Sequence, residues 1–432
     1  MDQSMQGISS SSNTEEDRIY AKVGWRLIPF LVLCYLVSYL DRVNVGFAKL
    51  QMLKDLNLSD AVYGLGAGIF FIGYFIFEIP SNLILHRVGA KVWIARIMIT
   101  WGIISAAMMF TNSATTFYVL RFLLGVAEAG FFPGIVLYLT YWYPNARRGR
   151  MTTLFMLAVP LSGLIGGPIS GWIMSSVSGH GLAGWQWLYL LEGIPAIIIG
   201  IIVLFYLDDH IDKAKWLTDS EKAILSRNIA AEDQIKEEPS IMIAMCMPRV
   251  WIMAFTYFGF VMGLYGVGFW MPSIIKATGV NSTLEIGMLT AIPNLFAIIG
   301  MVLISRSSDR MRERRWHLAI PAVIAALGLI WSTSAGSVAL SMTALTIANV
   351  GICTVLPLLW SQPTAMLSGT AAAAGIALIN SVGNLAGFFS PSLVGWLKGV
   401  TGSTTSGMYL LAASLVVGAL LALSQPAKLV NK

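Results

Sequence analysis

Two acid–base pairs within apolar sequence are the strongest chemical signal in this chain. Asp41 and Arg42 are adjacent in an apolar segment of about 27–47, and Arg121 and Glu128 lie seven residues apart in another. At 3.6 residues per turn, Arg121 and Glu128 share one face of a helix. A charge at the centre of a bilayer costs roughly 2.5–3.5 kcal/mol on insertion scales, so such residues usually pair and carry a function. The pairs therefore predict a polar pathway through the first half of the chain.

The residue types in these pairs suit the binding of an anion and of a proton. Arginine offers a planar fork of donors that fits a carboxylate, which makes Arg42 a candidate anion anchor. A neighbouring carboxyl competes with an incoming anion for the same guanidinium. We therefore hypothesise that protonation of Asp41 or Glu128 frees the arginine for substrate. Two alternatives remain: static salt bridges that brace helices, or a first helix that ends at Leu40 with a polar flank.

Composition identifies a membrane protein. The chain has 432 residues, of which 56% are hydrophobic and 12% charged, whereas globular domains carry roughly 25% charged residues. The net charge of +6 does not indicate nucleic acid, because the basic residues follow membrane topology. The three cysteines and four histidines show no metal-ligand spacing, and no catalytic or phosphate-loop motif is present. We expect no metal, no cofactor and no enzymatic activity.

Twelve apolar segments, each near the ~20 residues that a bilayer requires, predict an all-α membrane protein with 12 transmembrane helices. The expected spans are 27–47, 61–85, 92–111, 115–143, 150–176, 185–207, 249–275, 282–304, 317–335, 338–366, 370–397 and 404–424.

A weak internal repeat divides these helices into two halves. Segment 167–172 in the fifth helix resembles 390–396 in the eleventh, and loop 86–91 resembles loop 308–315. Corresponding elements in two halves predict two pseudo-symmetric six-helix bundles with a site between them near the membrane midplane. The expected organisation is a disordered tail (1–18), a first bundle (19–207), a cytoplasmic central loop (208–248) containing a short helix capped by Thr218 or Asp219, a second bundle (249–426) and a C-terminal tail (427–432).

The distribution of basic residues predicts the orientation. Of 28 lysines and arginines, 22 lie on the side that both termini share, and two, Arg42 and Arg121, lie within helices. The opposite side has four, Lys49, Lys54, Lys276 and Lys398. The positive-inside rule then places both termini in the cytoplasm.

The two corresponding loops also carry a family resemblance. They resemble the cytoplasmic loop motif Gly-x-x-x-Asp-Arg-x-Gly-Arg of the major facilitator superfamily, and the resemblance extends over about residues 26–423. The candidate gating residues on these loops are Arg87, Gly89, Asp309 and Arg310. The first loop departs from the motif, because His86 stands where the aspartate belongs. This departure weakens a charge-pair latch that the resemblance implies.

Within the superfamily, the chain resembles the anion:cation symporter branch. The segments that carry this resemblance are 39–44, 78–82, 121–133 and 378–384. Segments 212–218 and 308–315 are most similar to bacterial permeases for tartrate, rhamnonate and 4-hydroxyphenylacetate.

The resemblance implies proton-driven uptake of a small organic anion by alternating access. It assigns the substrate carboxylate to Arg42 and proton coupling to Asp41 and Glu128, with Arg121 as the partner on the fourth helix. Other substrate contacts implied are Tyr39, Tyr74, Asn380 and Ser381.

Further candidates come from the residues themselves. Tyr265 and Trp360 are either walls of the substrate site or packing aromatics. Asn380 and Asn384, four residues apart, either join helices or bind a hydroxyl-rich substrate. Glu78 is interpreted as a structural acid.

The expected partners are a small organic anion, protons and the lipid bilayer of a bacterial-type inner membrane, with a monomeric protein and no nucleic acid. A rival hypothesis is proton-antiport export of drugs or metabolites, because residues 163–171 resemble the end of an antiporter motif. A non-transporting membrane sensor is a further alternative.

Overall fold

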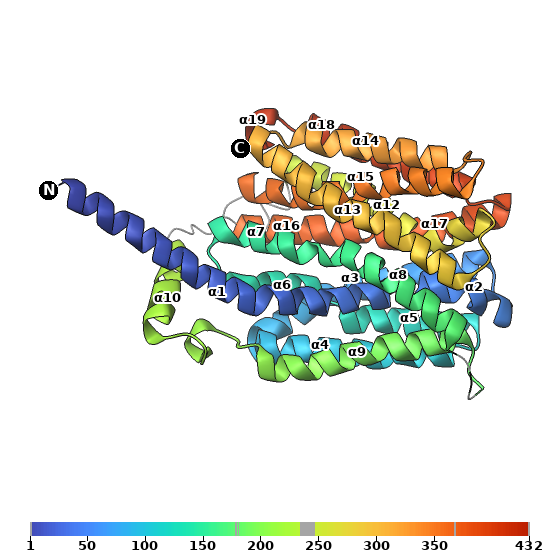
Figure 1. Ribbon diagram of the computed structural model, residues 1–432, viewed down its shortest axis with the longest axis horizontal. Helices are drawn as coiled ribbons and strands as arrows, with labels where there is room; N and C mark the ends of the chain where they lie inside the picture. Colours follow the sequence, from blue (N-terminus) through green and yellow to red (C-terminus); the bar gives the residue numbers. More distant parts are fainter. Residues whose placement is uncertain (1, 178, 180, 234–246, 367–368, 431–432) are drawn as a thin grey trace.

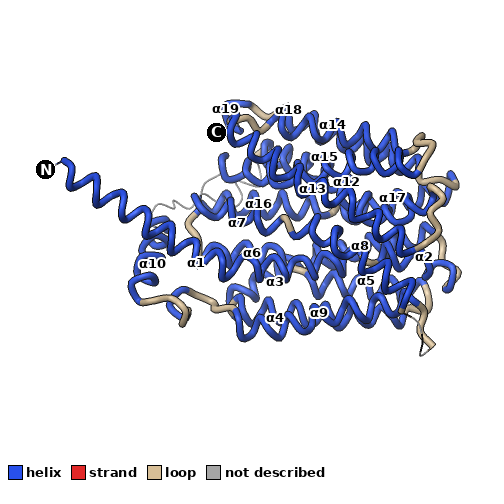
Figure 2. The backbone as a smooth tube through the Cα atoms, viewed as in Figure 1, coloured by secondary structure: helices blue, strands red, loops and turns tan. Residues whose placement is uncertain are grey.

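The computed structural model describes residues 2–177, 179, 181–233, 247–366 and 369–430, and this part of the chain is built from helices (Figure 1). Figure 2 shows these helices with the loops and turns between them. The elements of the first half are α1 (Asp2–Val43), α2 (Val45–Asp55), α3 (Asp60–Val88), α4 (Ala90–Ala107), η1 (Met108–Phe110), α5 (Ala114–Glu128), α6 (Phe131–Thr140), α7 (Asn145–Met156), α8 (Ala158–Ser176) and α9 (Gly184–Tyr206). The later elements are η2 (Ile211–Lys213), α10 (Asp219–Asp233), α12 (Pro248–Ala277), α13 (Thr283–Met311), α14 (Arg315–Ser332), α15 (Val338–Met366), α16 (Gly369–Asn384), α17 (Ala386–Thr401), α18 (Thr405–Ser424) and α19 (Ala427–Val430).

The membrane-spanning segments agree with the twelve that the sequence predicts. Among the described residues, 11 helical segments are long and apolar enough to cross a membrane. The remaining expected segment, 370–397, is formed by α16 and α17, which are 16 residues each. Leu385 separates them, so neither helix alone has the length of a full span.

The helices form two bundles that lie side by side in Figure 1. Within the first bundle α4 packs along α9 and α3 along α5, and within the second α14 packs along α15 and α18. The bundles meet along α8 with α13, α3 with α17, and α2 with α12. This is the predicted arrangement of two six-helix halves.

Three membrane-spanning segments are interrupted next to residues that the sequence singled out. The first breaks at Asn44, two residues after Arg42, the fourth at Ala129–Gly130, directly after Glu128, and the eleventh at Leu385. Gly130 has a φ of +85°, and a Cβ there would overlap the side chain of Ser81. Interrupted helices are typical of binding sites in transporters.

The two bundles are closed against each other at one end. Both termini lie at one end of the molecule in Figure 1, and we call the opposite end, which carries α2 and the last turns of α17, the outer end. Gly64 of α3 lies against the backbone of Pro391 in α17, so closely that a Cβ would overlap its carbonyl oxygen. Gly171 of α8 likewise contacts Gly287 of α13. These small residues let the bundles approach at backbone distance.

The terminal segments differ from the expectation. Instead of a disordered tail over 1–18, α1 begins at Asp2 and projects from the bundle in Figure 1. Asp17 forms an ion pair with Arg147 at 2.6 Å, a contact between distant segments that composition cannot reveal. The expected C-terminal tail contains α19.

The central loop contains the short helix that the sequence predicts. Thr218 caps α10: its hydroxyl accepts from the Glu221 backbone N–H at 3.3 Å, and Glu221 Oε2 accepts from the Thr218 N–H at 2.8 Å. Such a capping box stabilises a helix start. Residues 234–246 of the expected loop lie outside the described residues.

Candidate functional site

Arg42 lies between the two bundles and contacts both. Its side chain is 5% exposed and forms an ion pair with Glu128 of α5. It also donates a hydrogen bond to the Tyr265 hydroxyl of α12 at 2.8 Å. Ser38, one turn before Arg42, donates to Glu128 Oε1 at 2.7 Å. One guanidinium therefore joins α1 and α5 to a helix of the second bundle.

Aromatic rings surround the guanidinium. The ring centroids of Tyr39, Phe70, Phe71 and Tyr74 lie between 5.3 and 6.0 Å from the Arg42 Cζ. Such rings stabilise a cation through their π faces while excluding water. The Nε of Arg42 has no hydrogen-bond partner among the described residues. Arg42 is thus held as a cation with a donor remaining for a ligand.

A cavity between the bundles reaches this arginine. The space between atoms in this cavity, part of it open to solvent, amounts to about 410 Å³. Its lining includes five of the candidate substrate contacts besides Arg42: Tyr39, Tyr74, Tyr265, Asn380 and Asn384. The structure thus gathers residues from α1, α3, α12 and α16 around one space.

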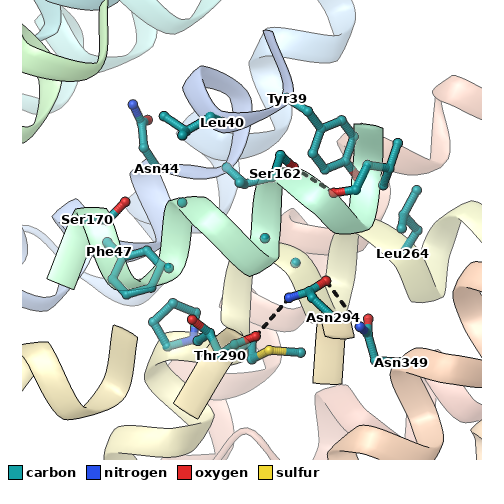
Figure 3. Close-up of a pocket in the computed structure, with 18 of the residues that line it drawn as sticks. Tyr39, Leu40, Asn44, Phe47, Ser162, Ser170, Leu264, Thr290, Asn294 and Asn349 are labelled. Carbon is teal, nitrogen blue, oxygen red and sulfur yellow. Dashed lines mark hydrogen bonds between the residues drawn. The ribbon is translucent and has the colours of Figure 1, made fainter. Parts of the chain in front are cut away.

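A second cavity adjoins the first and shares Tyr39 with it (Figure 3). The space between its atoms, part of it open to solvent, amounts to about 650 Å³. Figure 3 shows Asn294 hydrogen-bonded to both Thr290 and Asn349 on its wall. Both amides belong to the second bundle, and Asn294 lies against Gly163 of α8. Amide donors and acceptors at a cavity wall suit a ligand that carries hydroxyl groups.

Asp41 does not pair with Arg42. Its carboxylate accepts hydrogen bonds from Trp101 Nε1 at 3.1 Å and from the Ser105 hydroxyl at 2.8 Å. Both donors belong to α4, inside the first bundle, and Asp41 is 2% exposed. Adjacent positions of a helix point about 100° apart, so neighbours in sequence face different surroundings. The expected Asp41–Arg42 pair is therefore absent from the structure.

Arg121 also departs from its expected role. It is fully buried, and its guanidinium donates to the carbonyl oxygens of Gly66 at 3.3 Å and Ala67 at 3.1 Å. Glu128 pairs with Arg42 instead. A separation of seven residues corresponds to about 10 Å along a helix, too far for a direct ion pair. Arg121 fastens α5 to α3 and does not line the cavities.

The polar residues of α16 contact an acid of the first bundle. Asn380 Nδ2 donates to Glu78 Oε1 at 2.6 Å, and the Ser381 hydroxyl donates to Oε2 at 3.4 Å. Glu78 is 4% exposed. Its carboxyl therefore joins the two bundles and does not lie in water at a helix end. Ser381 lies outside the cavity lining. Trp360 also lies outside it and packs edge-on against Tyr257.

The candidate gating residues make contacts within their own halves. Gly89 ends α3 and lies against Asp209, whose carboxylate accepts from the Lys91 N–H at 2.8 Å. Asp309 pairs with Arg314 at 2.6 Å. Arg87 and Arg310 are exposed. Between these loops, the described residues show no charge-pair latch across the bundles.

Several contact residues were not identified from sequence. The sequence spacing could have identified Ser38, because it lies one helical turn before Arg42. Trp101 and Ser105 share a face of α4, but no sequence pattern indicates that this face contacts Asp41. The sequence indicates a structural acid at Glu78, and only the packing of α16 reveals its partners.

Two six-helix bundles around a buried guanidinium–carboxylate pair define a membrane transporter. The chain belongs to the Major Facilitator Superfamily, whose family model matches residues 31–391. It is 52% identical over 414 residues to a protein of Agrobacterium vitis named as a candidate tartrate transporter, covering 95% of this chain and 92% of that protein. This similarity confirms the resemblance to tartrate-type permeases.

Other relatives carry different names. The chain is 51% identical over 418 residues to a candidate metabolite transport protein, NicT, of Pseudomonas putida, covering 96% of each. It is 41% identical over 417 residues to a quinolone resistance transporter of Acinetobacter baumannii, again covering 96% of each. Among solved structures, a D-xylose-proton symporter aligns with a TM-score of 0.73 at 16% identity, covering 93% of this chain and 98% of that one. At this identity the structural likeness concerns the fold.

Proposed function

We propose that the protein is a proton-coupled symporter that takes up a small organic carboxylate by alternating access. The observation that carries the proposal is the buried Arg42, which contacts Glu128 in one bundle and Tyr265 in the other. A substrate carboxylate bound there would touch both bundles at once. Its binding energy would then favour the occluded state in which the bundles are close together.

Coupling follows from competition for one guanidinium. Glu128 and a substrate carboxylate are both acceptors for Arg42, and a buried cation between two carboxylates leaves one negative charge without a partner. A proton on Glu128 removes that excess charge and releases the guanidinium to the substrate. Asp41, bound to Trp101 and Ser105, is a second acid in the same bundle. We assign it a subordinate role in proton transfer.

The substrate class is supported by the cavity walls. Asn380, Asn384, Asn294 and Asn349 present amide groups at the two cavities, which suits a substrate that carries hydroxyl groups. The relative named for tartrate transport is consistent with that chemistry. Sugar acids and tartrate-like hydroxy acids are therefore the proposed substrates.

The proposed setting is a bacterial-type inner membrane, with both termini in the cytoplasm and a monomer as the transporting unit. The excess of basic residues on the side of the termini supports this orientation. The outer end then faces away from the cytoplasm.

Export is a second candidate, because a relative at 41% identity is named for quinolone resistance. An exporter would use the same fold to expel a drug in exchange for protons. The buried Arg42 argues against a cationic drug, since both would carry the same charge. Direction of transport separates the two functions.

The test is uptake into proteoliposomes after a pH jump, with radiolabelled tartrate and a panel of sugar acids and aromatic acids. Wild type should accumulate a hydroxy acid only under an inward proton gradient, and Arg42→Ala should not. Arg306→Ala removes an exposed arginine and serves as the control. Acid-driven expulsion of a preloaded quinolone, without uptake of any acid, would replace symport by export.

A further inference from the structure

Two of the four basic residues on the outer side meet at one carboxylate. Lys49 Nζ of α2 lies 2.7 Å from Asp60 Oδ1, and Lys398 Nζ of α17 lies 3.0 Å from Asp60 Oδ2. Both ammonium groups lie over the ring of Trp270, at 3.3 and 5.5 Å from its centroid. We call Lys49, Asp60, Lys398 and Trp270 the outer lysine cluster.

The outer lysine cluster carries more positive than negative charge. Two ammonium groups share a single carboxylate, and the ring of Trp270 compensates only part of the excess, because cation–π contacts contribute about 0.5–2 kcal/mol. Asp55, another acid at this end, accepts a hydrogen bond from Trp185 of the first bundle and does not pair with either lysine. With both lysines protonated, this charge excess would favour one more anion.

The cluster is partly reachable from outside. The side chains of Asp60 and Lys398 are each 26% exposed, whereas that of Lys49 is 4% exposed. An anion arriving at the outer end therefore meets Lys398 first. Lys49 becomes accessible only when its cover moves.

The contact between the two bundles is what buries Lys49. Lys49 and Asp60 belong to the first bundle, and Lys398 and Trp270 to the second. Gly395 of α17 packs against the backbone of Asp60. A Cβ placed on Gly395 would lie only 2.6 Å from the Asp60 carbonyl oxygen. Opening of the outer end must therefore separate Lys398 and Trp270 from Asp60 and Lys49, which exposes both ammonium groups.

We propose that the outer lysine cluster is an entry subsite for organic carboxylates. A carboxylate from outside takes the place of Asp60 as the partner of Lys398, which loosens the ion pair that holds the bundles together at this end. The anion then moves inward to Arg42. This inference rests on the proposed uptake function and adds to it a second, low-affinity anion site.

The decisive test compares two substitutions that break the same ion pair. Uptake of radiolabelled tartrate is measured in right-side-out vesicles with a fixed inward proton gradient. Lys398→Gln removes a cation of the subsite and should raise the external KM about fivefold, the range of a partly exposed ion pair. Asp60→Asn removes the competing carboxylate and should lower the external KM. If the cluster only locks the bundles, both substitutions shift the external KM in the same direction, and the subsite is refuted.

Controls separate this subsite from general electrostatics and from misfolding. Lys54→Gln removes an exposed lysine of α2 from the same end and should leave the external KM unchanged. Equal effects of Lys54→Gln and Lys398→Gln would mean nonspecific attraction by net charge. Lys398→Arg keeps the cation and should restore the wild-type KM, and in inside-out vesicles the KM should be unaffected by any of these changes. Absence of anion uptake by the wild type would instead refute the proposed function.

Discussion

Arg42 and Glu128 form an ion pair at the level where both of their membrane-spanning segments are interrupted. The breaks at Asn44 and at Ala129–Gly130 follow these two residues closely. Asn44 keeps helical dihedral angles, and its N–H donates to the Leu40 carbonyl oxygen at 2.9 Å, whereas Gly130 adopts a left-handed conformation. The pair joins α1 to α5, so a change in its charge acts on the contact between these two helices.

Neutralising Glu128 should separate proton coupling from substrate binding. Glu128→Gln keeps the shape and one acceptor oxygen but cannot gain or lose a proton. We expect it to abolish accumulation under a proton gradient and to retain counterflow exchange of labelled for unlabelled acid. Both assays use the same proteoliposomes, so expression is controlled internally. Accumulation at the wild-type level would remove Glu128 from the coupling mechanism.

Removing the Tyr265 hydroxyl should weaken substrate binding. This hydroxyl accepts from Arg42 at 2.8 Å, and hydrogen bonds to charged groups contribute about 1.5–3 kcal/mol. Tyr265→Phe should therefore raise the KM about tenfold or more, because the guanidinium loses the contact that orients it toward the second bundle.

A matched control for that substitution is Tyr189→Phe. The Tyr189 hydroxyl is buried without a hydrogen-bond partner among the described residues, so its removal should leave the KM unchanged. A KM of Tyr265→Phe equal to that of wild type would show that Tyr265 does not orient the anion anchor.

Arg121 should matter for stability more than for transport affinity. Arg121→Met removes the two hydrogen bonds that fasten α5 to the carbonyl oxygens of Gly66 and Ala67 in α3, each of which contributes about 0.5–1.5 kcal/mol. We expect a lower midpoint of thermal unfolding in detergent and an unchanged KM for the protein that folds. A large rise in KM at wild-type stability would restore Arg121 to the substrate site.

Glu78 and Asn380 should act as one unit. Their hydrogen bond of 2.6 Å joins α3 to α16 across the bundles, and residues in direct contact show coupling of about 0.5–3 kcal/mol in double-mutant cycles. The uptake rates of Glu78→Ala, Asn380→Ala and the double variant measure that coupling. Asn384→Ala with Glu78→Ala is the reference pair. Additive effects for Glu78 and Asn380 would mean that the contact has no part in the transport cycle.

Apolar segment lengths predict the twelve helices, the internal repeat predicts their two halves, and charges within apolar segments single out Arg42 and Glu128 as candidates. These properties are local, because bilayer thickness sets the length of a span and charge is costly inside it. The partners of each charge are not local. Asp41 faces α4 although Arg42 beside it faces the cavity, and Glu128 pairs with Arg42 rather than with Arg121 on its own helix. Lys49 and Lys398, at opposite ends of the sequence, share Asp60 only because the bundles close against each other, since helix packing alone brings such distant positions into contact.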